Sequence, residues 1–440
     1  MIKVCKFGGT SMAEKSAIEK VKNIILSDDA RKYIVVSAPG KRNKSDIKIT
    51  DTLYKTYDEL IATGKIDENF SLIKERFIGI VKELELSLDI EKILAQTEKE
   101  IIENKSQAFT ASRGEYLSAI VMANYLGFEF IDATELVRFD SEGKLNDDYT
   151  NDKVKMKLKG KTNVVIPGFY GKNSAGEIVT FSRGGSDITG SIIARGVKAD
   201  LYENWTDVSG FLMCDPRIVP DAEVIKQITY KELRELSYMG ASVLHAEAIF
   251  PVQKEKIPIN IRNTFRPEDP GTLILPNELY DTNSNEIITG VTGKKNFTVI
   301  FIEKAMMNYE VGFIRKVLSV IEHHNLCIEH IPSGIDTISV VIETDKLKDG
   351  VLGDIVDELR ESINPDYIHV LENVSLVATV GHGMKKRIGT AAQIFNALAE
   401  AKINIVMIDQ GSSELNIIIG VANEDYENCI RTIYNVFKKN

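Results

Sequence analysis

Cysteine and tryptophan are scarce in this sequence of 440 residues, and it has no excess of positive charge. The four cysteines, Cys5, Cys214, Cys327 and Cys429, are widely scattered and have neither CxxC nor zinc-finger spacing. This scatter predicts that the cysteines are reduced thiols in the core of a cytosolic protein. Acidic residues outnumber basic ones by 64 to 54, and the net charge of −10 argues against a general nucleic-acid or membrane-surface binder.

Long apolar runs are also missing, since none approaches the roughly 18 residues of a membrane span. The opening MIKVCKFGG reads as a strand entering a turn, without the charged leader and apolar core of a signal peptide. We therefore expect a cytoplasmic protein, and at roughly 150 residues per domain the length suggests about three domains.

Between residues 1 and about 280, short apolar strands alternate with helical segments. The predicted strands are 32–38, 127–133, 162–171 and 257–263, and residues 66–104 carry an apolar stripe at helical spacing. This alternation predicts an α/β domain with a mostly parallel sheet covered by helices. Such sheets bind ligands where their strands end and loops lead into helices.

The C-terminal part contains an ungapped repeat. The segment NFTVIFIEKAMMNYEVGFIRKVLSVIEHHNLCIEHI, from Asn296, aligns with NVSLVATVGHGMKKRIGTAAQIFNALAEAKINIVMI, from Asn373, 77 positions later. Each copy reads as strand, glycine-bearing loop, amphipathic helix, strand, turn and strand, with Gly312 matching Gly389. We expect the apolar strand 286–292 to complete the second copy, so that the first is inserted within it.

Two short segments combine glycines with charge. KFGGTS places Lys6 at a strand end, and its glycines precede a helix that we expect to begin near Ser11, whose amides suit phosphate. A plain strand–helix turn is the alternative. FSRGGSD sets Arg183 and Asp187 around a double glycine, for which we see no packing role that other residues would not serve better. Arginine suits bidentate capture of a carboxylate.

Two further segments are ambiguous when taken alone. SRGEYLSA places Glu115 in the expected first turn of a helix, where an acidic residue suits the helix dipole without any function. ENWTDVSGFLMCDPRIVPDA gathers Thr206, Asp207, Asp215 and Arg217 in a loop after a strand. Its Asp-Pro-Arg triplet could be only a turn, and its tryptophan is expected in the core.

Together these segments resemble the aspartokinases, which have the amino-acid kinase fold. The motifs KFGGTS, IVVSA with KITD, SRGEYLSA, GFYG, FSRGGSD, TDVSGFLMCDPRIV and GASVLH occur in family order, and the repeat resembles a tandem pair of ferredoxin-like ACT modules. The resemblance covers essentially the whole chain. It implies a kinase domain over 1–280, with helices on both faces of its sheet, and ACT modules over 281–365 and 366–440.

The resemblance implies the site residues and the reaction, phosphorylation of the β-carboxylate of L-aspartate by ATP. The expected catalytic and aspartate-binding residues are Lys6, Ser37, Thr50, Glu115, Arg183 and Asp187. Arg183 would pair with the α-carboxylate, and Glu115 and Asp187 would favour the ammonium. The expected ATP-binding residues are Lys6, Gly8, Gly9, Thr206, Asp207, Phe211, Asp215, Arg217 and Ser242. The chain departs from the family at Phe211-Leu212, where a tyrosine is common, and at Ser242, where a lysine is common, so the adenine and ribose contacts stay open.

The mechanism follows from charge. The β-carboxylate is already ionised at pH 7, so no strong general base is required. The enzyme must align it with the γ-phosphorus and stabilise spread negative charge, which we assign to Lys6, the glycine-loop amides and Mg²⁺. Because Mg²⁺ takes most ligands from phosphates and water, no metal-ligand cluster is expected in the protein.

The ACT modules imply regulation by an end-product amino acid and assembly into a homodimer or homotetramer. The expected effector residues are Met307, Glu310, Gly312, Phe313, Ile314, Ile328, Glu329 and Ser333. Glu329 offers an anion to a cationic side chain, so lysine is favoured over threonine. The second copy has Val406 and Gln410 where the first has Glu329 and Ser333. The alternatives are a related kinase acting on another acid and a catalytically inactive amino-acid sensor.

Overall fold

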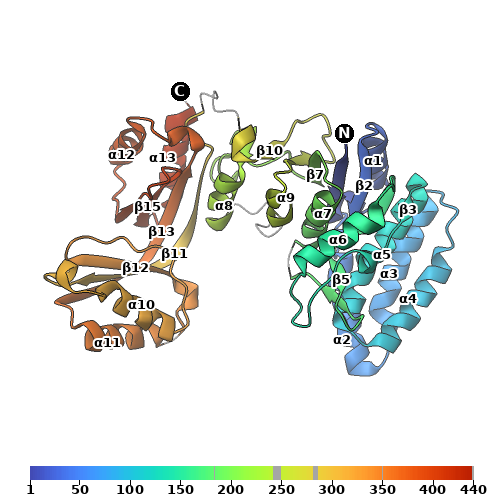
Figure 1. The fold of residues 1–440 in the computed structure, drawn as a ribbon, viewed down its shortest axis with the longest axis horizontal. Helices are drawn as coiled ribbons and strands as arrows, with labels where there is room; N and C mark the ends of the chain where they lie inside the picture. The colour runs from blue at the N-terminus through green and yellow to red at the C-terminus, as the bar shows by residue number, and fades with distance from the viewer. Residues whose placement is uncertain (183, 241–248, 281–285, 349, 439–440) are drawn as a thin grey trace. The chain divides into compact units, whose positions relative to one another are not determined.

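The structure is a computed structural model that describes residues 1–182, 184–240, 249–280, 286–348 and 350–438. These form two compact units (Figure 1). The described residues of the first unit are 1–182, 184–211, 224–230 and 249–280, and those of the second are 212–223, 231–240, 286–348 and 350–438. Within these ranges we find no helix that combines the length and the apolar character of a membrane span.

The first unit is built on an eight-stranded sheet with the order β3-β4-β2-β1-β7-β9-β10-β8. All neighbours pair in parallel except β9 and β10, as expected for a mostly parallel α/β sheet. The strands are β1 (Lys3–Phe7), β2 (Arg31–Val36), β3 (Glu129–Phe130), β4 (Val164–Pro167), β7 (Leu201–Thr206), β8 (Gln227–Thr229), β9 (Ile259–Asn263) and β10 (Thr272–Leu275). A separate hairpin pairs β5 (Tyr170–Lys172) with β6 (Ile178–Thr180).

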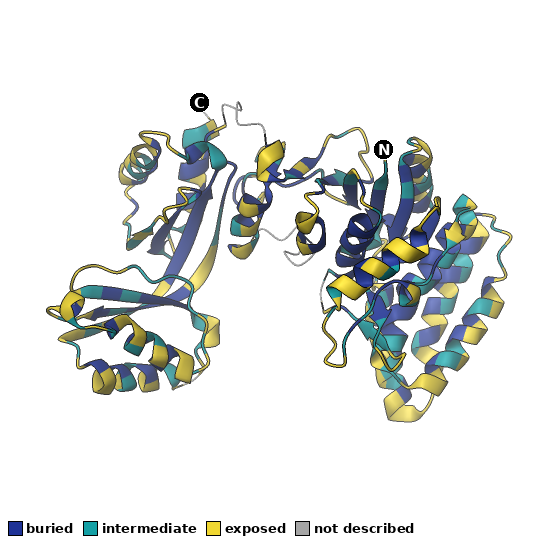
Figure 2. Cartoon of the chain, viewed as in Figure 1, coloured by how far each residue is buried: buried dark blue, intermediate teal, exposed yellow. Residues whose placement is uncertain are grey.

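Helices cover this sheet, and their inward faces are buried while their outer faces are exposed (Figure 2). They are α1 (Lys15–Leu26), α2 (Ile49–Thr63), α3 (Asp67–Glu83), α4 (Ile90–Asn104), α5 (Gln107–Leu126), α6 (Asp147–Leu158), α7 (Gly185–Gly196) and α9 (Phe250–Lys254). The helix α8 (Tyr230–Tyr238) begins at the boundary between the units.

The alternation of side chains along β1 and β7 decides what each face of the sheet carries. Cys5 and Phe7 pack in one apolar core with Trp205 and with residues of α1 to α5, so the tryptophan is a core residue as expected. The intervening Lys6 therefore points to the opposite face, the one against which α7 packs. In register, Lys6 pairs with Asn204 of β7.

The helical stripe predicted over residues 66–104 corresponds to two helices, α3 and α4, and the side chain of Asp89 accepts a hydrogen bond from the amide of Lys92 and caps α4. Two other expected boundaries were wrong. The strand expected over 127–133 is only two residues long. A short 3₁₀ turn spans Gly9–Met12, so α1 begins at Lys15 and not near Ser11.

The second unit contains a five-stranded antiparallel sheet with the order β12-β11-β13-β15-β14. The strands are β11 (Gly290–Glu303), β12 (Thr337–Glu343), β13 (Tyr367–Val380), β14 (Met407–Asp409) and β15 (Asn416–Ala422). The helices are α10 (Phe313–His323), α11 (Val351–Ile363), α12 (Thr390–Glu400) and α13 (Tyr426–Lys438). Two apolar cores flank this sheet, one with α10 and α11 and one with α12 and α13.

The sequence repeat has a matching conformational repeat. Gly312 and Gly389 each immediately precede a helix. Their φ angles are 82° and 93°, in the left-handed region that favours glycine. Asn296 and Asn373 also share a positive φ, at 69° and 59°. β11 pairs with β13 along its length, from Gly290 opposite Val380 to Glu303 opposite Tyr367, and from Phe297 onward it also pairs with β12. The expected module limits at 281–365 and 366–440 remain a prediction.

Candidate active site

Lys6, Asn204 and Asp187 meet on one face of the first unit's sheet. Nζ of Lys6 lies 2.6 Å from Oδ1 of Asp187, and Nδ2 of Asn204 donates to the same oxygen over 3.0 Å. Lys6 and Asn204 are buried cross-strand neighbours, and Asp187 lies in the first turn of α7. The three residues form a polar cluster near the carboxyl ends of β1 and β7, where parallel sheets bind ligands. Sequence reasoning missed Asn204, although its register with Lys6 follows from pairing β1 with β7.

The double glycine before Asp187 has a structural role, contrary to the sequence-based interpretation. Gly184 has a φ of 58°, in the left-handed region. A Cβ on Gly185 would lie 2.7 Å from the ring of Phe169, and one on Gly168 would lie 2.6 Å from the Ser186 side chain. The loop at 168–169 therefore packs directly on the start of α7, and the two glycines are no independent sign of a ligand.

The glycine loop after β1 packs against the loop after β2. The amide of Gly40 donates to the carbonyl of Gly9 over 2.8 Å, and a Cβ on Gly40 would lie 2.7 Å from the carbonyl carbon of Gly9. Gly8 donates to the carbonyl of Trp205. Arg76 of α3 donates to the carbonyls of Ala13 and Gly40 and fixes both loops. Gly40 was missed in the sequence, although it lies only two residues after IVVSA.

Glu115 lies in the middle of α5, because Ser106 caps this helix and starts it at Gln107. The first-turn dipole explanation of Glu115 is therefore wrong. Its side chain is buried, and Oε2 has no hydrogen-bond partner. Burial raises the pKa of Glu115 to about 8, although the Ala38 amide and the charge of Lys6 act in the opposite direction. A buried carboxylate with a free oxygen is suited to receive a cationic group.

Ser37 and Thr50 lie at the ends of elements around this cluster. The amide of Ser37, just after β2, donates to the carbonyl of Phe7 over 3.1 Å, so Ser37 adjoins the strand that carries Lys6. Thr50 is in the first turn of α2, four residues before Tyr54. The start of α2 packs on α5 beside Glu115, because a Cβ on the neighbouring Gly114 would lie 3.4 Å from the side chain of Ile49.

The loop after β7 is held by side chains of β9 and beyond. Oγ1 of Thr206 donates to Asp207, and Nδ2 of Asn263 donates to Ser209 over 3.0 Å. Phe211 is only 1% exposed, so its side chain has almost no free surface for a nucleotide. Thr206 and Asp207 keep polar atoms at the strand end, where an ATP contact is expected.

Four other predicted site residues lie either in the second unit or outside the described residues. Asp215 and Arg217 form a bidentate ion pair in the second unit, and Arg217 is 89% exposed. Arg183 and Ser242 lie outside the described residues. The expected roles of all four remain predictions.

The predicted effector residues lie on the first repeat copy. Glu310 pairs with Lys316 at 2.6 Å and with Lys304 at 3.0 Å, and hydrogen bonds from these lysines lower its pKa. Glu329 is half-buried and accepts a hydrogen bond from the hydroxyl of Tyr238 on α8. Of the remaining residues, Met307 and Phe313 are buried, Gly312 and Ile328 half-buried, and Ile314 and Ser333 exposed. Ile328 also lines a cavity of about 390 Å³ beside α10.

Comparisons with known proteins identify the family. The model of the amino acid kinase family matches residues 1–263, and that of the ACT domain matches residues 377–437. Aspartokinase 3 of Bacillus subtilis is 36% identical over 99% of this chain and 98% of its own length. The crystal structure of Clostridium acetobutylicum aspartate kinase has a TM-score of 0.89 and 53% identity, and covers 99% of both chains.

The crystal structure of E. coli aspartokinase III with aspartate and ADP has a TM-score of 0.74 and 25% identity, and that with lysine and aspartate has 0.72 and 26%. The former covers 100% of both chains and the latter 99%. The match to the kinase family model, the match to the ACT domain model and the similarity along nearly the whole chain all indicate the same family. The chain belongs to the amino acid kinase family and, within it, to the aspartokinases.

Proposed function

We propose that this chain transfers the γ-phosphoryl group of ATP to the β-carboxylate of L-aspartate and produces 4-phospho-L-aspartate. The observation that carries the proposal is the cluster of Lys6 and Asp187 with the unpartnered carboxylate oxygen of Glu115. The cluster combines one cation, which would contact the oxygens of the transferred phosphoryl group, with two carboxyl groups, which would bind an ammonium group. The E. coli relative that was solved with aspartate and ADP supports both substrates.

In this proposal, Lys6 acts on the phosphate oxygens. Its ion pair with Asp187 and the hydrogen bond from Asn204 to Asp187 hold both side chains in place before substrates bind. A fixed cation aimed at the site of developing charge lowers the barrier without reorganisation. Gly8 and Gly9 contribute backbone to the same loop, and Thr206, Asp207, Asp215, Arg217 and Ser242 are the proposed nucleotide contacts.

Aspartate binding is assigned to both of its charged ends. Glu115 and Asp187 receive the ammonium, Arg183 pairs with the α-carboxylate, and Ser37 and Thr50 complete the pocket. Because the pKa of Glu115 is about 8, this carboxyl is mostly protonated at pH 7 in the free enzyme. The arriving ammonium favours its ionised form, so substrate binding releases a proton.

The chemistry requires no protein base, because the attacking β-carboxylate is ionised at neutral pH. Mg²⁺ bound to the phosphates of ATP would neutralise part of their charge. The glycine loop and Lys6 would hold such a complex through its phosphate oxygens. What the chain itself supplies is alignment of the two reactants.

We further propose that lysine is the regulatory effector, at the residues from Met307 to Ser333 named above. The E. coli relative that was solved with lysine supports this choice. Glu329 is already hydrogen-bonded to Tyr238, so a lysine ammonium that takes Glu329 would compete with this contact between the first repeat copy and α8. The ACT modules are also the proposed surface of a homodimer or homotetramer.

A coupled assay of ADP release tests the proposal. Turnover is expected with L-aspartate, and saturating lysine is expected to suppress it more than saturating threonine. Turnover that is equal without aspartate would contradict the reaction. Suppression by threonine alone would contradict only the choice of effector.

A further inference from the structure

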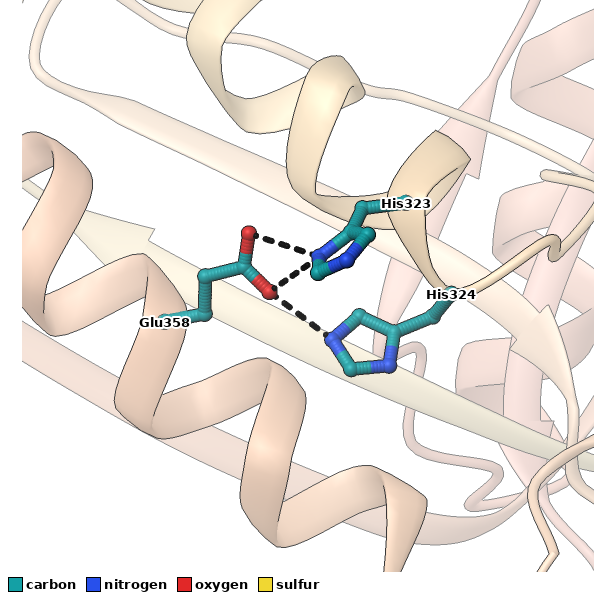
Figure 3. Close-up of side chains that lie close together, drawn as sticks. All are labelled: His323, His324 and Glu358. Carbon is teal, nitrogen blue, oxygen red and sulfur yellow. Dashed lines mark hydrogen bonds and ion pairs between the residues drawn. The ribbon is translucent and has the colours of Figure 1, made fainter.

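A cluster of potential metal ligands lies in the second unit, apart from the residues assigned to catalysis and to the effector. His323 is the last residue of α10, His324 follows it, and Glu358 lies on α11, so the two helices of one layer contribute (Figure 3). Each residue offers one atom within 4.8 Å of the others. Among the described residues, it is the one such group of three.

The distances suit coordination. Nδ1 of His323 and Nε2 of His324 each lie 3.0 Å from Oε2 of Glu358, and all three side chains point to one place (Figure 3). A transition-metal ion bonds to such atoms at about 2.0–2.2 Å, which requires ligand atoms about 2.8–3.6 Å apart for angles between square and tetrahedral. Small side-chain rotations therefore suffice to admit an ion.

The donor atoms select the class of ion. Two imidazole nitrogens with one carboxylate oxygen suit Zn²⁺ and its transition-metal neighbours, whereas Mg²⁺ and Ca²⁺ prefer oxygen ligands alone. His324 is 16% exposed, Glu358 34% and His323 72%, so the ion would be shielded on the side of His324 and open to water on the side of His323. Three protein ligands with an open position are a recurring zinc arrangement.

The position of the cluster links it to the effector segment. α10 begins at Phe313, among the proposed effector residues, and ends at His323. Its buried side chains share a core with those of α11, which carries Glu358. An ion held by both helices would therefore restrain the end of α10 relative to α11.

A hydrogen-bonded ion pair is the competing explanation. The histidines hydrogen-bond to Glu358 and lower its pKa. Exposed ion pairs of this kind contribute little to folding stability. An ion pair alone therefore gives little reason for three side chains to converge here. We propose that His323, His324 and Glu358 form a binding site for a divalent transition-metal ion, Zn²⁺ first among them.

This site was not predicted from the sequence, because its ligands have no motif spacing. The two histidines are adjacent, and Glu358 comes from the next helix of the same layer. The packing of α10 on α11 brings them together.

Metal titration of the full-length chain, without a histidine tag, tests the proposal. Calorimetry with Zn²⁺ and visible absorption with Co²⁺ are expected to give one saturable site per chain. His324→Ala and Glu358→Gln should each weaken Zn²⁺ affinity at least about 10-fold. Loss of a residue that only hydrogen-bonds to a metal ligand already lowers metal affinity by that factor. His369→Ala removes an exposed histidine outside the cluster and should bind like the wild type. Cys327→Ser controls for the exposed thiol.

Melting temperature supplies a second readout that does not depend on activity. Zn²⁺ should raise the melting temperature of the wild type and of His369→Ala, but not that of Glu358→Gln, whose metal-free melting temperature reports on its folding. The proposal is overturned if no saturable binding occurs, if Glu358→Gln binds as tightly as the wild type, or if binding is lost only in Cys327→Ser.

Discussion

The substitution Glu115→Gln examines the proposed ammonium contact through its pH dependence. The structure raises the pKa of Glu115 to about 8 by burial, and the ammonium of aspartate needs the ionised form. At pH 7 about nine-tenths of the free enzyme would be protonated, and ionising it costs about 1.4 kcal/mol, or about tenfold in affinity. The aspartate KM of the wild type should therefore fall about tenfold for each pH unit between 6 and 7.5, and level off near 8.

Glu115→Gln removes the titrating group and keeps its shape. Its aspartate KM should be high and almost independent of pH in this range. Calorimetry in two buffers of different ionisation enthalpy should detect release of nearly one proton on aspartate binding to the wild type at pH 7, and almost none with the variant. Glu103→Gln, at an exposed position on α4, is the matched control and should behave like the wild type. A wild-type KM that is flat from pH 6 to 8, without proton release, would refute the role of Glu115.

The same substitution has a consequence for stability. The folded pKa of Glu115 lies above its ordinary value of 4.5, so the folded state binds more protons than the unfolded state between about pH 4.5 and 8. This group therefore lowers stability as pH rises through that window. Without substrate, Glu115→Gln should be more stable than the wild type at pH 8, by roughly 1–3 kcal/mol in chemical denaturation, and the difference should shrink at pH 5.

Four other substitutions address the remaining assignments. Lys6→Ala should lower kcat by about 10²–10³-fold in the coupled assay, and a kcat within threefold of wild type would contradict its role. Arg183→Ala should raise the aspartate KM by about 10–100-fold through loss of a charge-assisted pair, so near-normal saturation counts against it. Gly40→Ala should destabilise the chain by about 1–3 kcal/mol in denaturant titration, because its Cβ would lie 2.7 Å from the backbone of Gly9; an unchanged midpoint would show that the loops adjust freely. Glu329→Ala should relieve lysine inhibition by about 10-fold and keep the rate without lysine, and unchanged inhibition would place the effector elsewhere.

The sequence predicted the architecture because the fold depends on patterns that a chain shows directly. Strand–helix alternation predicted the mostly parallel sheet, and the ungapped repeat predicted two similar copies. Gly312 and Gly389 illustrate the second point, since both precede a helix in the same left-handed conformation. Boundaries were less predictable, because a local cap such as Asp89 divides a continuous apolar stripe into two helices.

The site was predicted in part. Lys6 and Asp187 were named from their motifs, but Asn204 was missed because its role depends on which strand lies beside β1. The double glycine before Asp187 was read as a sign of a ligand, whereas it permits close packing of Phe169. Glu115 was named through family resemblance, while its burial and raised pKa follow from tertiary packing that no local pattern contains.

Trapping the product tests the central claim most directly. An acyl phosphate reacts with hydroxylamine, so the purified chain with ATP, Mg²⁺ and L-aspartate should form aspartyl hydroxamate, quantified by mass spectrometry, at the rate of ADP release. L-Glutamate and N-acetylglutamate should give little or none, and Lys6→Ala should reduce the yield from aspartate about 10²-fold or more. ADP release without hydroxamate, or equal hydroxamate from glutamate, would contradict phosphorylation of the aspartate β-carboxylate at this site.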